Sequence, residues 1–417
     1  MAGPGIRYTK VAKTLSRVAD VTLAVTNQKN TDDKSVPVVS PENNSYRPFF
    51  DGTDIIFAQW LSNEMLAYAA SKGKAVIFDL YAPVPIEFLA HLEFSKSDPD
   101  PKKNVEFGNI IEMYRHYFNL GSYFVCSNER QKDFWMGFLT AQKIIGPDTF
   151  TKRSFGERFL IGPMGIDKTP PKPKRLLLRS RLGLSKDDFI LLWTGGIWDW
   201  FDAQLVVKAM SKVNNPKVKL VFLGTKHPNT DVYQEEMGES LQARKLSEKL
   251  GLLDKSVFFL DGWVPYEERL SYLADADAAI YADKDSLETR YSHRSRVLDH
   301  IWAGLPTICS RGDYLSEVIE SKGLGIVVNR SVAEFAGAIN ELAKPAVYKN
   351  CVANLKKAMS QFTWEQTLLP LCDVVSSMDL SFLAHQAKTQ SKKYSGTKRL
   401  PIKSRVKQSA RIMLLGR

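Results

Sequence analysis

Residues 292–306 read SHRSRVLDHIWAGLP, and this stretch contains a helix, the end of that helix and the approach to a strand. Gly304 suits a left-handed C-cap, and Pro306 cannot continue a helix, so we expect a strand at Thr307 to Cys309. The apolar residues that predict the helix recur at helical spacing: Val297, Leu298, Ile301 and Trp302.

Asp299 is a carboxylate on this otherwise apolar helix. Burial of an unpaired carboxylate is costly, so Asp299 needs a partner. Arg296 and His300 lie on neighbouring turns and could pair with it. A bound ligand that donates hydrogen bonds would satisfy it equally well. The helical pattern alone leaves both interpretations open.

Apolar, β-branched runs alternate with helical patterns along the rest of the chain, which predicts an α/β protein with parallel sheets covered by helices on both faces. The strands expected in the first half are Val21–Val25, Ile55–Ala58, Ala75–Asp79, Tyr123–Cys126 and Phe159–Ile161. Those expected in the second half are Phe189–Trp193, Lys219–Phe222, Val257–Leu260, Ala278–Tyr281, Thr307–Cys309 and Gly325–Val328.

The 417 residues exceed what one hydrophobic core usually serves, so two domains are expected. Three prolines and four basic residues without periodicity mark an interdomain linker at 167–175. The domains are therefore 1–166 and 176–362, followed by a helical segment at 363–387 and a basic tail at 388–417.

Charge is concentrated in that tail. The net charge is +11, yet residues 388–417 hold ten Lys and Arg and no acid, which leaves +1 for the remainder. A neutral body with a basic tail favours either a solubilising extension or attraction to an anionic membrane surface. Aromatic residues interleave with the basic ones only at Tyr394, so nucleic acid is not an expected partner.

No apolar run is long enough for a transmembrane helix, and the N-terminus does not read as a signal peptide, so we expect a cytoplasmic protein, peripheral on the inner face of the membrane if the tail docks there. The cysteines stand singly without CxxC pairs, and neither zinc nor disulfides are expected. They are Cys126, Cys309, Cys351 and Cys372.

The run Asp299 to Pro306 resembles the ribose-binding helix of GT-B nucleotide-sugar glycosyltransferases, especially glycosyltransferase family 4. Segments similar to the nucleotide-binding half of that family occur in the family's order: LLWTGGIWDWFDAQLVVKAM, VKLVFLGTKHPN, VFFLDGWVPYEERLSYLADADAAIYA and RGDYLSEVIESKGLGIVV. Three earlier segments resemble the acceptor half of a little-characterised bacterial branch of the surface polysaccharide type: GPGIRYTKVAKTLSRVADVTLAV, FDLYAPVPIEF and CSNERQKDFWMG.

The resemblance implies two Rossmann-like, doubly wound domains that face a central cleft, with the 363–387 helix crossing back to the first domain. It implies transfer of a hexosyl or related sugar, with retention, from a UDP, GDP or dTDP donor to a glycan or lipid-linked acceptor. The departing phosphate oxygen would deprotonate the acceptor hydroxyl. Neither a cofactor nor a metal ion is expected.

Thr194 to Asp202 follows a strand and precedes a helix, which is where ligands bind in parallel sheets. The resemblance assigns the donor diphosphate to this turn and to the end of the next strand, through Gly195, Gly196, Trp198 and Gly224. The family has basic residues at this turn, whereas this chain has Trp198, Asp199 and Asp202. The neutralising charge would therefore come from Arg290, Arg294 or Arg296. The alternative for these arginines is a surface salt bridge with Glu288 or Asp299.

The resemblance also assigns the rest of the donor site. Trp263, Val264 and Tyr266 would hold the nucleobase, and Asp299 the ribose. Tyr291 stands where the family has its first glutamate, so Glu288 is the acid assigned to the sugar hydroxyls, and His293 is assigned to the sugar or phosphate end.

On the acceptor side, Gly3, Gly5 and Arg7 resemble a loop that opens a helix at Tyr8 to Ser16. No strand precedes this loop, so either a late start codon omits one or the domain does without it. Tyr81 and Glu87 complete the acceptor side, and Asp79 would orient a hydroxyl. The residues expected in the catalytic centre are thus Asp79, Glu288, His293 and Arg294.

Two other classes of function stay open. The same frame serves sugar-nucleotide 2-epimerases, which need no second acceptor. The unusual residues Trp198 and Asp202 also permit a non-catalytic subunit that binds nucleotide or glycan without transfer.

Overall fold

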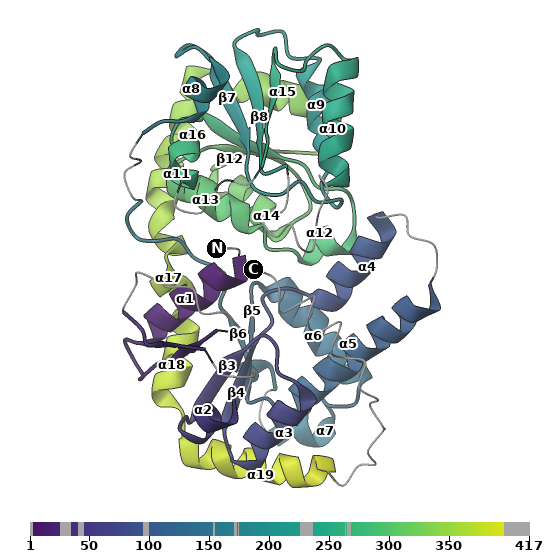
Figure 1. Ribbon diagram of the computed structural model, residues 1–417, viewed down its shortest axis with the longest axis vertical. Coiled ribbons are helices and arrows are strands. Elements are labelled where there is room, and N and C mark those ends of the chain that lie inside the picture. Colours follow the sequence, from purple (N-terminus) through teal and green to yellow (C-terminus); the bar gives the residue numbers. More distant parts are fainter. Residues whose placement is uncertain are drawn as a thin grey trace.

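The computed structural model describes residues 3–25, 35–40, 46–94, 100–152, 155–170, 173, 175–225, 237–262, 264 and 268–395. The chain forms two α/β domains, each with its own parallel sheet (Figure 1). The strands and the helices that cover them alternate along the chain, as the sequence pattern predicts.

The N-terminal domain contains a four-stranded parallel sheet in the order β3-β4-β5-β6. These strands are β3 (Ile55–Ala58), β4 (Ala75–Asp79), β5 (Tyr123–Cys126) and β6 (Phe159–Ile161), which have the predicted bounds. Its helices are α1 (Gly3–Leu15), α2 (Arg47–Asp51), α3 (Asn63–Ser71), α4 (Val84–Phe94), α5 (Pro101–Leu120), α6 (Glu129–Ala141) and α7 (Pro147–Lys152).

The C-terminal domain contains a six-stranded parallel sheet in the order β12-β11-β10-β7-β8-β9. The strands are β7 (Phe189–Trp193), β8 (Val218–Leu223), β9 (Val257–Leu260), β10 (Ala278–Tyr281), β11 (Thr307–Ser310) and β12 (Gly325–Val328). The helices are α8 (Leu178–Leu182), α9 (Ala203–Met210), α10 (Gly238–Lys249), α11 (Arg269–Leu273), α12 (Leu287–Tyr291), α13 (Ser295–Ala303), α14 (Tyr314–Lys322), α15 (Val332–Leu342) and α16 (Pro345–Ala358).

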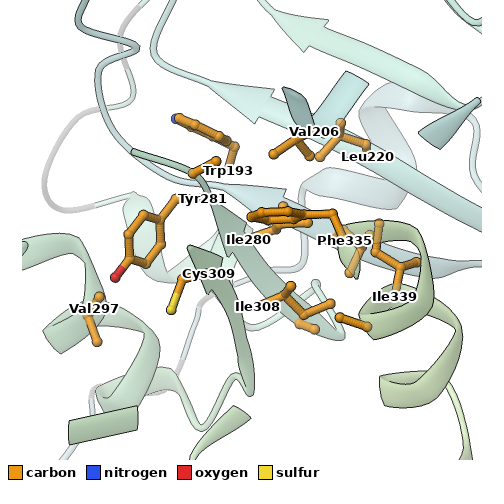
Figure 2. Packing of buried hydrophobic residues seen from close by; sticks show 14 of the residues in the cluster. Trp193, Val206, Leu220, Ile280, Tyr281, Val297, Ile308, Cys309, Phe335 and Ile339 are labelled. Atoms are coloured by element: carbon orange, nitrogen blue, oxygen red, sulfur yellow. The ribbon is translucent and has the colours of Figure 1, made fainter. Parts of the chain in front are cut away.

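The core of this domain lies between the six-stranded sheet and its helices (Figure 2). Its strands are continuous apolar runs because helices cover both faces of a parallel sheet. Leu220 and Ile280 project from the sheet toward Phe335 and Ile339 of α15, and all four are fully buried. Burial of one such side chain stabilises the fold by about 1.5–3 kcal/mol.

The first residues of the domain are helical, so the loop expected at Gly3 and Gly5 is wrong. Helix α1 begins at Gly3 and includes Arg7. Pro4 is tolerated there because a helix leaves its first N–H groups without intrahelical partners. The strand expected at Val21–Val25 is reduced to β1 (Leu23–Ala24), which pairs with β2 (Val38–Val39) outside the main sheet.

Two crossings of the chain connect the domains. Ile166 and Thr363 form a parallel bridge, in which the Ile166 N–H donates to the Phe362 carbonyl over 2.8 Å. Beyond this hinge the chain packs on the N-terminal domain as α17 (Trp364–Thr367), α18 (Leu369–Ser377) and α19 (Leu380–Ser395). Residues 388–395, which we assigned to the basic tail, are the end of α19, and 396–417 lie outside the described residues.

Within the described ranges, no helix has the length and apolar character needed to cross a membrane. The four cysteines are free; three of them are buried and Cys372 is partly exposed. Each belongs to a hydrophobic core cluster or packs against one.

Candidate functional site

The two domains meet at the carboxyl ends of their sheets, where α12 contacts α4 and α6 (Figure 1). The segments that leave β4 and β5 approach those that leave β10 and β11. Most candidate residues that the structure describes lie on these segments or on the Gly-Gly turn after β7. The exceptions are Gly3, Gly5 and Arg7 on α1, Gly224 after β8 and Val264 after β9. The topology therefore gathers them at one interdomain face.

The turns after β7 and β8 require glycine at Gly195 and Gly224. Gly195 and Gly224 adopt φ values of 71° and 79°, which side-chain-bearing residues rarely adopt. A Cβ on Gly224 would lie 3.3 Å from the Gly195 backbone, and one on Gly196 would lie 2.9 Å from Nε1 of Trp198. The two strand ends are thus in close contact, and the Trp198 indole lies against the turn, stacked on Trp200 at 5.6 Å.

Arg296 supplies the charge that this turn lacks. Its Nη2 donates to the Gly196 carbonyl over 2.7 Å, and its guanidinium stacks 4.0 Å from the Phe201 ring centroid. Nη1 is buried and has no partner among the described residues. Burial and the charge of Arg294 lower the pKa of Arg296 to about 9, so it remains cationic at neutral pH.

The partner of Asp299 is Arg269 of α11, at 3.2 Å, so pairing with Arg296 or His300 is wrong. His300 instead contacts the hydroxyls of Thr194 (2.8 Å) and Thr307 (3.1 Å). The Asp299 side chain is 27% exposed to solvent. Burial raises the pKa of its carboxyl and Arg269 opposes the rise. The carboxylate is therefore paired but accessible.

Arg294 forms ion pairs with acidic residues of its own domain. Its Nη1 and Nη2 donate to the two oxygens of Glu288 over 2.8 and 2.7 Å. Nη2 also lies 2.7 Å from Oδ1 of Asp283, although neither Asp283 oxygen accepts a well-directed hydrogen bond. The pKa of Asp283 is raised to about 7 by burial and by its acidic neighbour Asp313, against Arg294. Arg294 and Glu288 thus form a buried ion pair, unlike the surface salt bridge considered from the sequence.

His293 is partly buried, and both of its ring nitrogens are buried without hydrogen bonds to the described residues. Its ring lies 5.8 Å from that of Tyr314. Burial and the nearby Arg7 charge lower its pKa to about 3, so the ring is neutral at physiological pH. A neutral imidazole has one donor and one acceptor nitrogen to offer to a ligand.

Arg7 and Asp79 form a fully buried pair in the N-terminal domain. Nε and Nη2 of Arg7 each donate to an Asp79 oxygen over 2.7 Å, and Nη2 also donates to the Gly162 carbonyl over 2.8 Å. Burial raises the pKa of Asp79, and Arg7 opposes that rise. Because both oxygens accept from Arg7, Asp79 fixes this arginine in place.

Tyr81 and Glu87 follow that pair along the chain. The Arg7 guanidinium lies 5.1 Å from the Tyr81 ring centroid. Glu87 is on α4, partly buried, and faces the Glu288 and Arg294 pair across the interface. Burial and the Glu288 charge raise the pKa of Glu87 to about 7.

Glu87 gives the protein a pH-dependent stability term. A carboxyl group whose pKa is raised in the folded state stabilises the fold when it is protonated. This contribution is complete below the pKa of the unfolded chain, about 4.5, and is lost as the pH rises through about 7. Wild type loses this contribution between pH 5 and pH 8, and Glu87→Gln has no such contribution to lose. The unfolding free energy of Glu87→Gln minus that of wild type should therefore increase by about 2 kcal/mol over this range. Urea titrations at both pH values measure this change. The exposed Glu93→Gln on the same helix is the control, and equal pH dependence in wild type and Glu87→Gln would refute the assignment.

The sequence-based site is thus only partly assembled as expected. Gly195, Gly196, Gly224, Arg296 and Asp299 lie at the ends of β7 and β8 and on α13. Val264 packs beside the second core cluster of this domain, whereas Trp263 and Tyr266 lie outside the described residues. Four residues at this face were not predicted from the sequence: Arg269, Asp283, and the two α6 residues Arg130 and Gln131, which donate to backbone carbonyls of the C-terminal domain. The run DADAAIYADKD marks the acid Asp283, but the arginine partners are distant in sequence and leave no local signal.

The site lies between two Rossmann-like domains, and this architecture is the GT-B fold of nucleotide-sugar glycosyltransferases. Residues 188–344 match the family model described as glycosyl transferases group 1. No curated protein matches the chain.

Solved structures confirm the fold over nearly the whole chain. Anabaena HepE in complex with UDP-glucose superposes with a TM-score of 0.65 at 14% identity, over 91% of this chain and 98% of that chain. WaaG, a glycosyltransferase involved in lipopolysaccharide biosynthesis, gives 0.60 at 14% identity over 91% and 97%. Sucrose-phosphate synthase from Thermosynechococcus elongatus gives 0.61 at 15% over 89% and 92%.

Proposed function

We propose that this protein transfers a hexosyl or related sugar from a nucleoside-diphosphate donor to a glycan or lipid-linked acceptor, as in family 4. The observation that carries the proposal is Arg296, a cation without a carboxylate partner that is fixed against the Gly195–Gly196 turn. A diphosphate is the ligand class that this combination of glycines and guanidinium suits. The structures of HepE with UDP and UDP-glucose support the same ligand class.

The donor extends from the Gly-Gly turn along α13. Arg296 binds the diphosphate with its unpartnered Nη1. Asp299 lies one turn further along the same helix and accepts from the ribose hydroxyls, in place of its contact with Arg269. Val264 contacts the base. UDP is the first donor nucleotide to test, before GDP and dTDP.

Transfer breaks the bond between the anomeric carbon and the phosphate oxygen, and an acceptor hydroxyl oxygen bonds to that carbon on the same face. The hydroxyl proton passes to the departing phosphate oxygen. Arg296 stabilises the charge that develops there. This mechanism retains anomeric configuration and includes neither cofactor nor metal ion.

The remaining site residues take different roles. His293 is neutral and unpartnered, so it contacts the sugar or the acceptor at the interdomain face. Tyr81 and Glu87 contribute to the acceptor side. Arg294 and Asp79 position their partners Glu288 and Arg7, because both terminal nitrogens of Arg294 and both carboxylate oxygens of Asp79 already form hydrogen bonds. This assignment replaces the catalytic roles that the sequence indicated for them.

The acceptor is lipid-linked in this proposal, and the ten basic residues of 388–417 bring the protein to an anionic membrane surface. The chain returns to the N-terminal domain through α19, so the tail begins on the acceptor domain.

Asp299→Asn is expected to weaken UDP binding about tenfold, because an amide is a weaker acceptor for the ribose hydroxyls than a carboxylate. Calorimetric titration measures this effect, and Asp285→Asn, an exposed acid of the same domain, serves as the control. Unchanged affinity in Asp299→Asn would remove this residue from the ribose site.

The proposed function is tested by incubating the purified protein with UDP-, GDP- and dTDP-sugars, with and without a membrane lipid extract. Release of a nucleoside diphosphate that depends on the extract supports transfer. Conversion of the sugar without an acceptor would indicate an epimerase. Binding without turnover under either condition would indicate a non-catalytic subunit.

A further inference from the structure

The N-terminal end of α6 connects the two domains. Asn128 caps this helix by accepting from the Gln131 N–H over 3.0 Å. The Gln131 side chain is fully buried, and its Oε1 accepts from the Ser127 N–H over 2.8 Å. This bond fixes the direction of its amide group, so Nε2 faces the interdomain surface.

Nε2 of Gln131 donates to one carbonyl in each domain. It lies 3.2 Å from the carbonyl oxygen of Tyr81, on the acceptor-side loop, and 2.9 Å from that of Tyr291, at the end of α12. Tyr291 is two residues before His293 and belongs to the segment that leads to Arg296. One amide group therefore connects the loop on the acceptor side with the segment that carries the donor-site cation.

Arg130 makes a second connection beside it. Its Nη1 donates to the carbonyls of Arg290 and Gly312, each over 2.9 Å, and Nη2 forms an ion pair with Glu317. Apart from the Glu317 carboxylate, the acceptors of Gln131 and Arg130 in the C-terminal domain are thus backbone carbonyls at the end of α12 and in the loop after β11. Such directed bonds to backbone fix the position of the segments themselves.

We infer that Gln131 and Arg130 are positioning residues that hold the domains together in the arrangement needed for transfer. The inference rests on the proposed function. The hinge at Ile166 and Thr363 is made of backbone bonds in a continuous crossing and can persist when the domains rotate. The Gln131 and Arg130 bonds each join a residue of one domain to the backbone of the other, so a rotation that separates these segments breaks them.

The test uses Gln131→Met, which keeps the side-chain length and removes the donor, and Arg130→Met, which changes a partly exposed residue if the buried variant does not fold. Asp133→Asn, exposed on the same helix, is the control, and Arg130→Lys tests rescue. Small-angle X-ray scattering with and without UDP measures the domain arrangement. Titration with UDP and steady-state kinetics measure donor affinity, kcat and KM.

We expect both Met variants to have a larger radius of gyration than wild type and a kcat lower by at least about tenfold, since a 1 Å misplacement can cost about a hundredfold. UDP affinity should stay within about threefold, because the donor residues belong to one domain. Arg130→Lys should recover part of kcat.

An unchanged radius of gyration and kcat in both variants would overturn the inference, as would an equal loss of UDP affinity and kcat. If wild type neither binds a nucleotide nor transfers a sugar, the proposed function fails. The scattering comparison still decides whether Gln131 and Arg130 hold the domains together.

Discussion

Replacement of Arg296 by glutamine is expected to weaken UDP binding between about tenfold and a hundredfold, because charge-assisted hydrogen bonds contribute about 1.5–3 kcal/mol. The unfolding free energy should change by less than about 1 kcal/mol. Arg296 has no carboxylate partner in the described part of the chain, and its lowered pKa shows that burial of its charge is unfavourable. The substitution should therefore change the UDP affinity strongly and the unfolding free energy only slightly.

Calorimetric titration and urea unfolding measure the two quantities on the same protein. Arg311→Gln is the matched control, since Arg311 is an exposed arginine of the same domain that pairs with Glu320. Arg296→Lys should bind UDP with intermediate affinity because lysine keeps the charge without the planar fork. Equal UDP affinity in wild type and Arg296→Gln would remove Arg296 from the diphosphate site.

Replacement of Arg294 by methionine should have the largest effect on stability, a loss of about 3–5 kcal/mol of unfolding free energy. The substitution leaves Glu288 and Asp283 buried without their cation, and these side chains are 3% and 0% exposed. Both carboxyls would then be protonated or drawn toward water, and the contact between α12 and α13 would be lost.

Urea unfolding at neutral pH measures this loss, with Arg311→Met as the exposed control, for which the expected change is below about 1 kcal/mol. The double substitution Arg294→Met with Glu288→Leu should recover part of the stability, because it removes one of the two uncompensated acids. A stable Arg294→Met protein that has lost only UDP binding would instead return Arg294 to the donor site.

The strands could be predicted because each is a short apolar run bounded by glycine, proline or polar residues. In the described part of the chain, all ten strands of the two main sheets fall where the pattern places them, since both faces of these parallel sheets are covered. The end of α13 was equally clear: Gly304 adopts φ 72° and Pro306 precedes β11.

The N-terminus could not be predicted from local signals. Glycines at positions 3 and 5 indicated a loop, yet they form the first turn of α1, and packing of this helix on the domain overrides their weak helical propensity. The strand at Leu23–Ala24 is short because its partner is the two-residue β2 rather than the main sheet.

The sequence indicates residues for a candidate donor site, but the pairings among those residues could not be predicted. Local spacing suggested Arg296 or His300 for Asp299, whereas the true partner, Arg269, is 30 residues earlier. Gln131 and Tyr291 are separated by 160 residues. Contacts of this kind depend on how the two sheets face each other, and no periodicity in the sequence records them.

The central claim is that the C-terminal domain binds a nucleoside diphosphate between the Gly195–Gly196 turn and α13. Calorimetric titration of the wild-type protein with UDP, GDP and dTDP, repeated on Asp299→Ala, tests it most directly. We expect micromolar binding of one nucleotide and loss of that binding in the variant. If a folded wild-type protein binds none of the three, the C-terminal domain is a GT-B scaffold without a donor site.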